Sequence, residues 1–164
     1  MPPDAERALI DWLIEAGLRN HDERELLGGL CERLKLAGLG LSRVLMASQL
    51  LHPQLQARGF LWRGDGVVRE EYGGGAGRDA GGDWPLSPFY HMVHEGLDSL
   101  RIRLDDSLEP GRFPLLDRLR AEGGTDYFAT ARRFTPERVL GDLSGVAVSW
   151  TTDRPGGFAE SELA

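Results

Sequence analysis

The sequence predicts a single α+β domain in which a central antiparallel sheet carries helices on both faces. Two observations predict it. Amphipathic helical patterns stand at both ends of the chain, and the strand-like segments between them include adjacent runs joined by turns. Adjacent strands favour antiparallel pairing, and the exposed faces of such a sheet need helices to bury them. With 164 residues and no break in composition, one core is expected.

Two helices are expected at the start of the chain. Residues 4–19 repeat apolar side chains every three or four positions, with acids and arginines opposite. Residues 22–38 follow, where Asp22 and Glu25 have the spacing of a capping box and Gly38 supplies the C-terminal stop. Each helix therefore has one apolar face to bury.

Three strands are expected next. Residues 41–51 are apolar on both alternating faces, which predicts a central strand covered on both sides. A short strand at 59–63 turns through residues 64–66 into another at 67–72, as a hairpin. Residues 73–82 are mostly glycine and predict a loop.

In the second half of the chain we expect a helix, a strand, a helix, two strands and a final helix, in that order. Ser87 followed by Pro88 is a typical helix start, and Gly123-Gly124 a typical helix end. We expect about six strands in one sheet, with both terminal helices together on one face. The predicted ranges are 87–95, 97–104, 114–122, 126–134, 143–152 and 158–164.

Bulk properties exclude several functional classes. The net charge of −7 and the scattered arginines argue against a nucleic-acid or anionic-membrane surface. No apolar run approaches the roughly 20 residues of a membrane span. A single cysteine, Cys31, excludes an internal disulfide and a multi-cysteine zinc site. A cytoplasmic location is the expectation.

Three motifs suggest chemistry and are rejected. Residues 75–80 match G-x-G-x-x-A, but no helix starts there to receive a phosphate. His91 and His94 share a helix face, yet a metal needs further ligands, so no metal site is expected. Cys31 lies on an apolar stripe, where a thiol serves as a small hydrophobe. No catalytic residue is predicted.

Polar and aromatic residues near strand ends form a candidate small-molecule pocket. They fit a ligand site, but His52 and Asp153 equally fit loop caps, and Trp62 and Tyr127 equally fit the core. The sequence leaves both interpretations open. The candidate ligand-binding residues are His52, Trp62, Phe89, Tyr90, Asp126, Tyr127, Asp153 and Arg154.

Several stretches together resemble the N-terminal, GAF-like sensory domain of bacterial class III adenylate/guanylate cyclases. The resemblance runs over nearly the whole chain, and its most specific pieces are LHP…GF.W and TDRPGGF. It implies a central antiparallel sheet with helices on both sides. The stretches are IDWLIEAGLR, ELLGGLCERLKLAGLGLSRVLMASQLLHPQLQARGFLWRGDG, SPFYHMVHEG, TDYFATARRF and SWTTDRPGGFAESELA.

The resemblance implies a regulatory role in cyclic nucleotide signalling and no catalysis in this segment. Residues 1–157 would form the sensory domain, and residues 158–164 would begin a connector helix to a C-terminal cyclase domain in cis. Any Mg²⁺ would belong to that cyclase domain, and no cofactor is expected here. The implied partners are a second copy, paired through the terminal helices, and a small-molecule ligand; nucleic acid and membrane are not among them.

Two other functions are alternatives to this one. A constitutive dimerisation scaffold without a ligand fits the sequence equally well, because the apolar stripes of the terminal helices suit both roles. A GAF-type sulfoxide reductase needs a nucleophilic and a resolving cysteine, and Cys31 alone argues against it.

Overall fold

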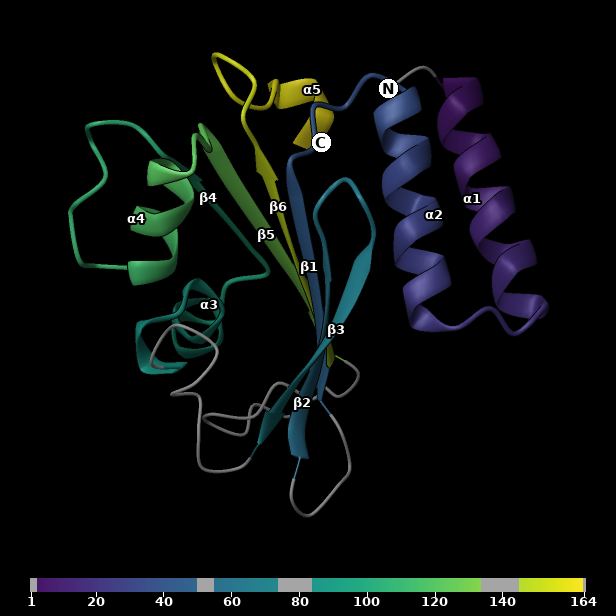
Figure 1. The fold of residues 1–164 in the computed structure, drawn as a ribbon, viewed down its shortest axis with the longest axis horizontal. Coiled ribbons are helices and arrows are strands. Elements are labelled where there is room, and N and C mark those ends of the chain that lie inside the picture. Colours follow the sequence, from purple (N-terminus) through teal and green to yellow (C-terminus); the bar gives the residue numbers. More distant parts are fainter. Residues whose placement is uncertain (1–2, 50–54, 74–83, 134–144, 164) are drawn as a thin grey trace.

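A six-stranded antiparallel sheet organises the chain, as the computed structural model shows in Figure 1. The structure describes residues 3–49, 55–73, 84–133 and 145–163. Every strand pair is antiparallel, which confirms the predicted sheet. In spatial order the strands are β3 (Val67–Gly73), β2 (Leu55–Trp62), β1 (Arg43–Gln49), β6 (Gly145–Thr152), β5 (Asp126–Arg133) and β4 (Ser99–Arg103).

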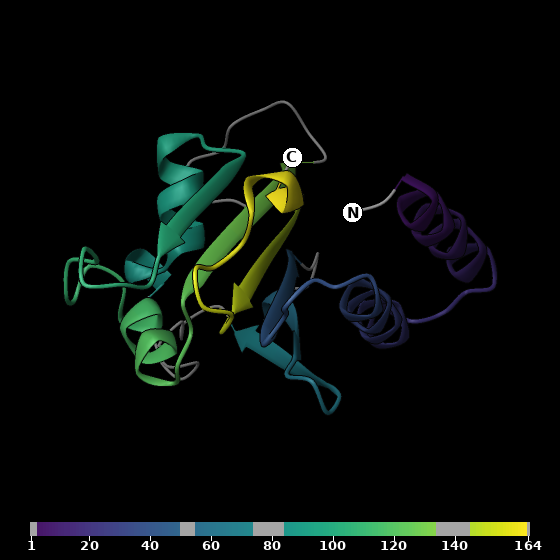
Figure 2. The same cartoon turned by 90° about the horizontal axis from the view of Figure 1, so that it is seen from above.

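Helices cover both faces of the sheet, as predicted (Figures 1 and 2). One pair, α3 and α4, lies on one side; the N-terminal pair, α1 and α2, lies on the other, with α1 outermost. No helix in the described part combines the length and apolarity needed to cross a membrane. The helices are α1 (Pro3–Leu18), α2 (Glu23–Leu36), α3 (Pro88–Glu95), α4 (Pro114–Ala121) and α5 (Glu160–Leu163), with a 3₁₀ turn at Trp84–Leu86.

Some element boundaries differ from those predicted. Strand β2 begins at Leu55 rather than at residue 59, because pairing with β1 and β3 continues into the residues before Gly59. The final helix is confined to Glu160–Leu163, since the preceding residues form a turn. The 3₁₀ turn was not predicted. Most of the predicted glycine-rich loop lies outside the described residues.

Each face of the sheet has its own core cluster. The α3/α4 cluster includes Leu45, Met92 and Leu116, and the α2 cluster includes Val44, Cys31 and Phe158. Alternate residues of β1 thus enter opposite clusters, which confirms the predicted central strand. Burial raises the pKa of Cys31 to about 12, so its thiol behaves as the expected small hydrophobe.

Helix α1 is held to the molecule largely by its contact with α2. The Arg33 guanidinium lies 3.8 Å above the centre of the Trp12 ring, and its Nη1 donates to the carbonyl of Gly29. Trp12 packs directly on Gly29: an ideal Cβ there would lie 2.5 Å from Trp12 Cζ2. The glycine is therefore required for the close approach of the two helices.

We predict that Gly29→Ala destabilises the protein whereas the neighbouring Gly28→Ala does not. Both changes gain up to about 1 kcal/mol of helix propensity. At Gly28 the added Cβ makes an ordinary 3.5 Å contact with Val67, but at Gly29 it overlaps Trp12, at a cost of about 1–3 kcal/mol. Urea unfolding of both variants measures the difference. Equal stability of the two variants would contradict this packing.

Candidate functional site

The residues predicted to share a pocket lie in several separate places. Phe89 and Tyr127 belong to the α3/α4 cluster, whereas Trp62 belongs to the α2 cluster on the opposite face. Burial raises the pKa of Tyr127 to about 12, so the phenol stays protonated. His52 lies outside the described residues. The sheet itself separates Trp62 from Phe89 and Tyr127.

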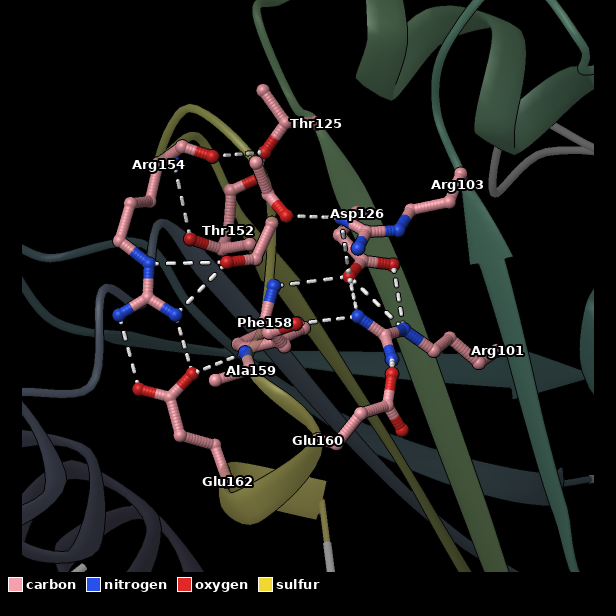
Figure 3. Close-up of polar contacts among 12 residues, drawn as sticks. Arg101, Arg103, Thr125, Asp126, Thr152, Arg154, Phe158, Ala159, Glu160 and Glu162 are labelled. Carbon is pink, nitrogen blue, oxygen red and sulfur yellow. Dashed lines mark hydrogen bonds and ion pairs between the residues drawn. The ribbon is translucent and has the colours of Figure 1, made fainter.

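The remaining predicted residues lie nearer the surface or near the C-terminus. Tyr90 is half-buried and stacks on His94, with ring centres 5.9 Å apart. Asp153 is exposed. Asp126 and Arg154 do come together, at the start of β5 and just after β6 (Figure 3). They hold the segment that follows β6.

We call this arrangement the C-terminal dock: Gly156–Glu162 held against Arg101, Arg103, Asp126 and Arg154 (Figure 3). A turn places the segment. The Gly157 amide donates to the Arg154 carbonyl at 2.9 Å, with Pro155 and Gly156 between them. Gly156 has φ +84°, the conformation that a type II turn demands of its third residue. The sequence Arg-Pro-Gly-Gly is therefore a turn with a specific geometry.

Asp126 is the buried anchor of the dock. Its side chain has no exposed surface, and its Oδ2 accepts from the Phe158 amide at 3.0 Å. The same oxygen accepts from Arg101 Nη2 at 2.8 Å, and Arg103 Nη1 lies 3.4 Å away. A buried carboxylate is costly unless it is paired and hydrogen-bonded. Here both arginines and the segment's own backbone satisfy it.

Arg154 forms the second attachment. Its Nε and Nη2 donate to the Gly157 carbonyl at 3.0 and 2.9 Å, and its Nη1 donates to Glu162 Oε1 at 3.0 Å. Glu162 Oε2 also accepts from the Ala159 amide at 2.7 Å, which caps the start of α5. The Arg154 guanidinium holds the pKa of Glu162 below its ordinary value of 4.5.

Further contacts hold the segment between its attachments at Asp126 and Arg154. Arg101 also donates to Glu160 and to the Phe158 carbonyl, and Arg103 donates to the Gly156 carbonyl. The Phe158 ring is buried in the α2 cluster. A helix as short as α5 has no stability of its own in water. Its position is therefore set by the dock.

Sequence reasoning found Asp126 and Arg154 but missed their partners. Arg101 and Arg103 occupy alternate positions of the edge strand β4, with the more apolar Ile102 between them. Alternation of this kind places both arginines on one face. The sequence therefore does contain one indication of the dock: two arginines on one strand face, and two acidic residues, Glu160 and Glu162, in the C-terminal segment. This pattern does not show that the two segments meet.

The dock is an assembly of ion pairs and backbone hydrogen bonds. Among the described residues, no three His, Cys, Asp or Glu side chains converge as a metal site would require. The arginines contact carboxylates and carbonyls of the chain itself. These contacts fix the position of α5.

We predict that Gly157→Ala disrupts the dock more than Gly156→Ala. Both glycines have positive φ, +72° and +84°, so alanine costs about 1–2 kcal/mol at either position. Only at Gly157 would the new Cβ also lie 2.5 Å from Asp126 Oδ2. The expected excess loss is about 1–3 kcal/mol, measured by urea unfolding. Equal losses would show that Asp126 does not pack on this turn.

Comparison with known proteins assigns no family to the chain. No family model matches it, and no curated protein sequence matches it. The role of the C-terminal dock is therefore inferred from its own chemistry.

Proposed function

We propose that this chain is a regulatory domain that acts through its docked C-terminal segment. Specifically, we propose a GAF-like sensory and dimerisation domain of a bacterial class III nucleotide cyclase, working in cyclic nucleotide synthesis and signal transduction. The observation that carries the proposal is the C-terminal dock. The TDRPGGF stretch, among the most specific parts of the resemblance, contains the turn of that dock and the Phe158 amide that binds Asp126.

The dock supports a regulatory role because it joins a short segment to the paired strands β5 and β6. Asp126 belongs to β5 and Arg154 lies two residues after β6, so a shift between these strands moves both attachments of α5. A ligand or partner can exploit this only through different affinities for two arrangements of the segment. In the proposal, α5 carries the change to a cyclase domain in cis.

A second feature supports pairing with a second copy. Ile10, Ile14 and Leu18 of α1 are 49, 58 and 80% exposed, although each is large and apolar. Their four-residue spacing puts them on one side of the helix, and α1 is the outermost helix (Figure 2). This stripe also favours the alternative, a constitutive dimerisation scaffold with no ligand. Catalysis and its Mg²⁺ would belong to the cyclase domain in either case.

A fusion enzyme tests the proposal. The chain is placed ahead of the catalytic domain of a class III cyclase, and cyclic nucleotide formation is measured for three forms. These are the parent sequence, Arg154→Gln and Arg120→Gln. We expect Arg154→Gln to change the rate by at least threefold, because it removes the pairing with Glu162 that positions α5. Arg120→Gln removes an arginine of α4 that contacts Asp105 and Asp106 rather than the docked segment, so it should leave the rate unchanged.

Ile14→Glu in the same fusion separates the two roles. If it abolishes dimerisation while Arg154→Gln leaves the rate unchanged, the scaffold alternative holds and the regulatory proposal fails. If Arg154→Gln changes the rate while the dimer persists, the docked segment regulates the cyclase.

A further inference from the structure

The segment Gly156–Glu162 is bound in the C-terminal dock largely through its backbone (Figure 3). One of its amides donates to Asp126 at 3.0 Å. Three consecutive carbonyls accept from Arg103, Arg154 and Arg101, in that order. Amides and carbonyls are common to all peptides. These contacts therefore fix the path of the segment without depending on most of its side chains.

Two side chains of the segment make the specific contacts. Phe158 is 3% exposed and packs in the α2 cluster, and Glu162, with its side chain 14% exposed, binds an arginine through both carboxylate oxygens. Glu160 also pairs with an arginine, but its side chain is 89% exposed, so this pair contributes less. The side chains at 159 and 161 are exposed. The dock therefore selects a phenylalanine and, four residues later, a glutamate, with a weaker preference for an acid between them.

Without the segment, the rest of the dock carries positive charge. We call this part the receiving side: Arg101, Arg103 and Arg154 with Asp126. Three arginines against one aspartate give it a net charge of two positive, and the two glutamates of the segment balance that charge. The whole chain, by contrast, has a net charge of −7. The receiving side is thus complementary to an acidic peptide.

The segment can leave the receiving side without breaking the sheet. In the described part of the chain, the pairing of β6 ends at Thr152, before the segment begins. The turn through Pro155 and Gly156 joins the two. Helix α5 is too short to be stable on its own, so it depends on the dock and not on the strands. Release would expose the receiving side while the strand pairing remains.

We infer that the receiving side is a peptide-binding site, which this chain's own segment occupies and which also accepts an acidic segment of a partner protein. That partner segment carries phenylalanine and, four residues later, glutamate. A buried aromatic anchor with charged pairs beside it is a common basis of peptide recognition. The purpose of the site rests on the proposed function, because a bound partner would displace α5. The chain's own segment is tethered, and its high effective concentration keeps the site filled until a partner binds more tightly.

A fluorescently labelled peptide with the sequence of residues 156–163 tests the inference, with binding to the full chain measured by anisotropy. In the parent chain the tethered segment competes with the peptide. In Gly157→Ala the new Cβ would lie 2.5 Å from Asp126 Oδ2, which keeps the tethered segment from docking. We expect the peptide to bind Gly157→Ala at least tenfold more tightly than the parent. Gly156→Ala is the matched control, because its Cβ meets no atom within 4 Å, and it should bind the peptide more weakly than Gly157→Ala.

Altered peptides and receiving-side variants test the specificity. A peptide with glutamine at both acidic positions should bind Gly157→Ala about tenfold more weakly, since the charged hydrogen bonds to the arginines are lost. Adding Arg154→Gln to Gly157→Ala should weaken binding of the acidic peptide, because Arg154 binds the second glutamate. Adding Arg120→Gln should not, since Arg120 contacts Asp105 and Asp106.

Three results would overturn the inference. They are no peptide binding to Gly157→Ala, equal binding of the acidic and neutral peptides, and a dimer of the parent chain that the peptide dissociates. The last would mean that a second copy, and not another protein, fills the site. If Gly157→Ala does not fold, Glu162→Gln replaces it in the same titration, because it weakens the tethered segment at Arg154. None of these results alters the cyclase rates of the fusion enzyme, so failure of peptide binding is distinct from failure of the proposed function.

Discussion

The buried carboxylate of Asp126 is the interaction on which the C-terminal part of the structure depends. It has no exposed surface, yet it is surrounded by two arginines and a backbone amide from a segment more than thirty residues away in sequence. Removing one partner from such a buried pair is strongly destabilising. Because the Phe158 amide is one of the partners, the cost of burying the charge is offset in full only when the segment is docked. Gly157 is needed so that the turn can approach the carboxylate.

The position of Asp126 on β5 connects the C-terminal dock to the core of the sheet. Successive residues of a strand point to opposite faces, so Asp126 enters the C-terminal dock while Tyr127 enters the α3/α4 cluster. Strand β6 repeats the arrangement: Thr151 is the cross-strand partner of Tyr127, whereas the Thr152 hydroxyl accepts from the Arg154 amide at 3.1 Å. The ends of these two paired strands therefore link the α3/α4 cluster to the C-terminal dock.

Local patterns were enough to predict most of the fold. The capping box of Asp22 and Glu25 starts α2 as expected, and the continuous apolar run around Val44 and Leu45 is a strand buried on both faces. The candidate site was harder, because strand alternation assigns residues to faces only once register and pairing are known. Trp62 and Tyr127 looked alike as aromatic residues at strand ends but lie on opposite faces. The contact of Arg101 with Asp126 depends on strand pairing and on a turn, which composition does not encode.

Hydrogen exchange at the amides of residues 158–163 tests the central claim most directly. Asp126→Asn keeps the shape of the side chain but removes its charge, so both arginines lose their buried partner. We predict that the Phe158 amide and those of α5 lose most of their protection, while the amides of β1, paired on both sides at the centre of the sheet, keep theirs. Unchanged protection of Phe158 in this variant would show that the Asp126 charge does not hold the segment, and would contradict the account.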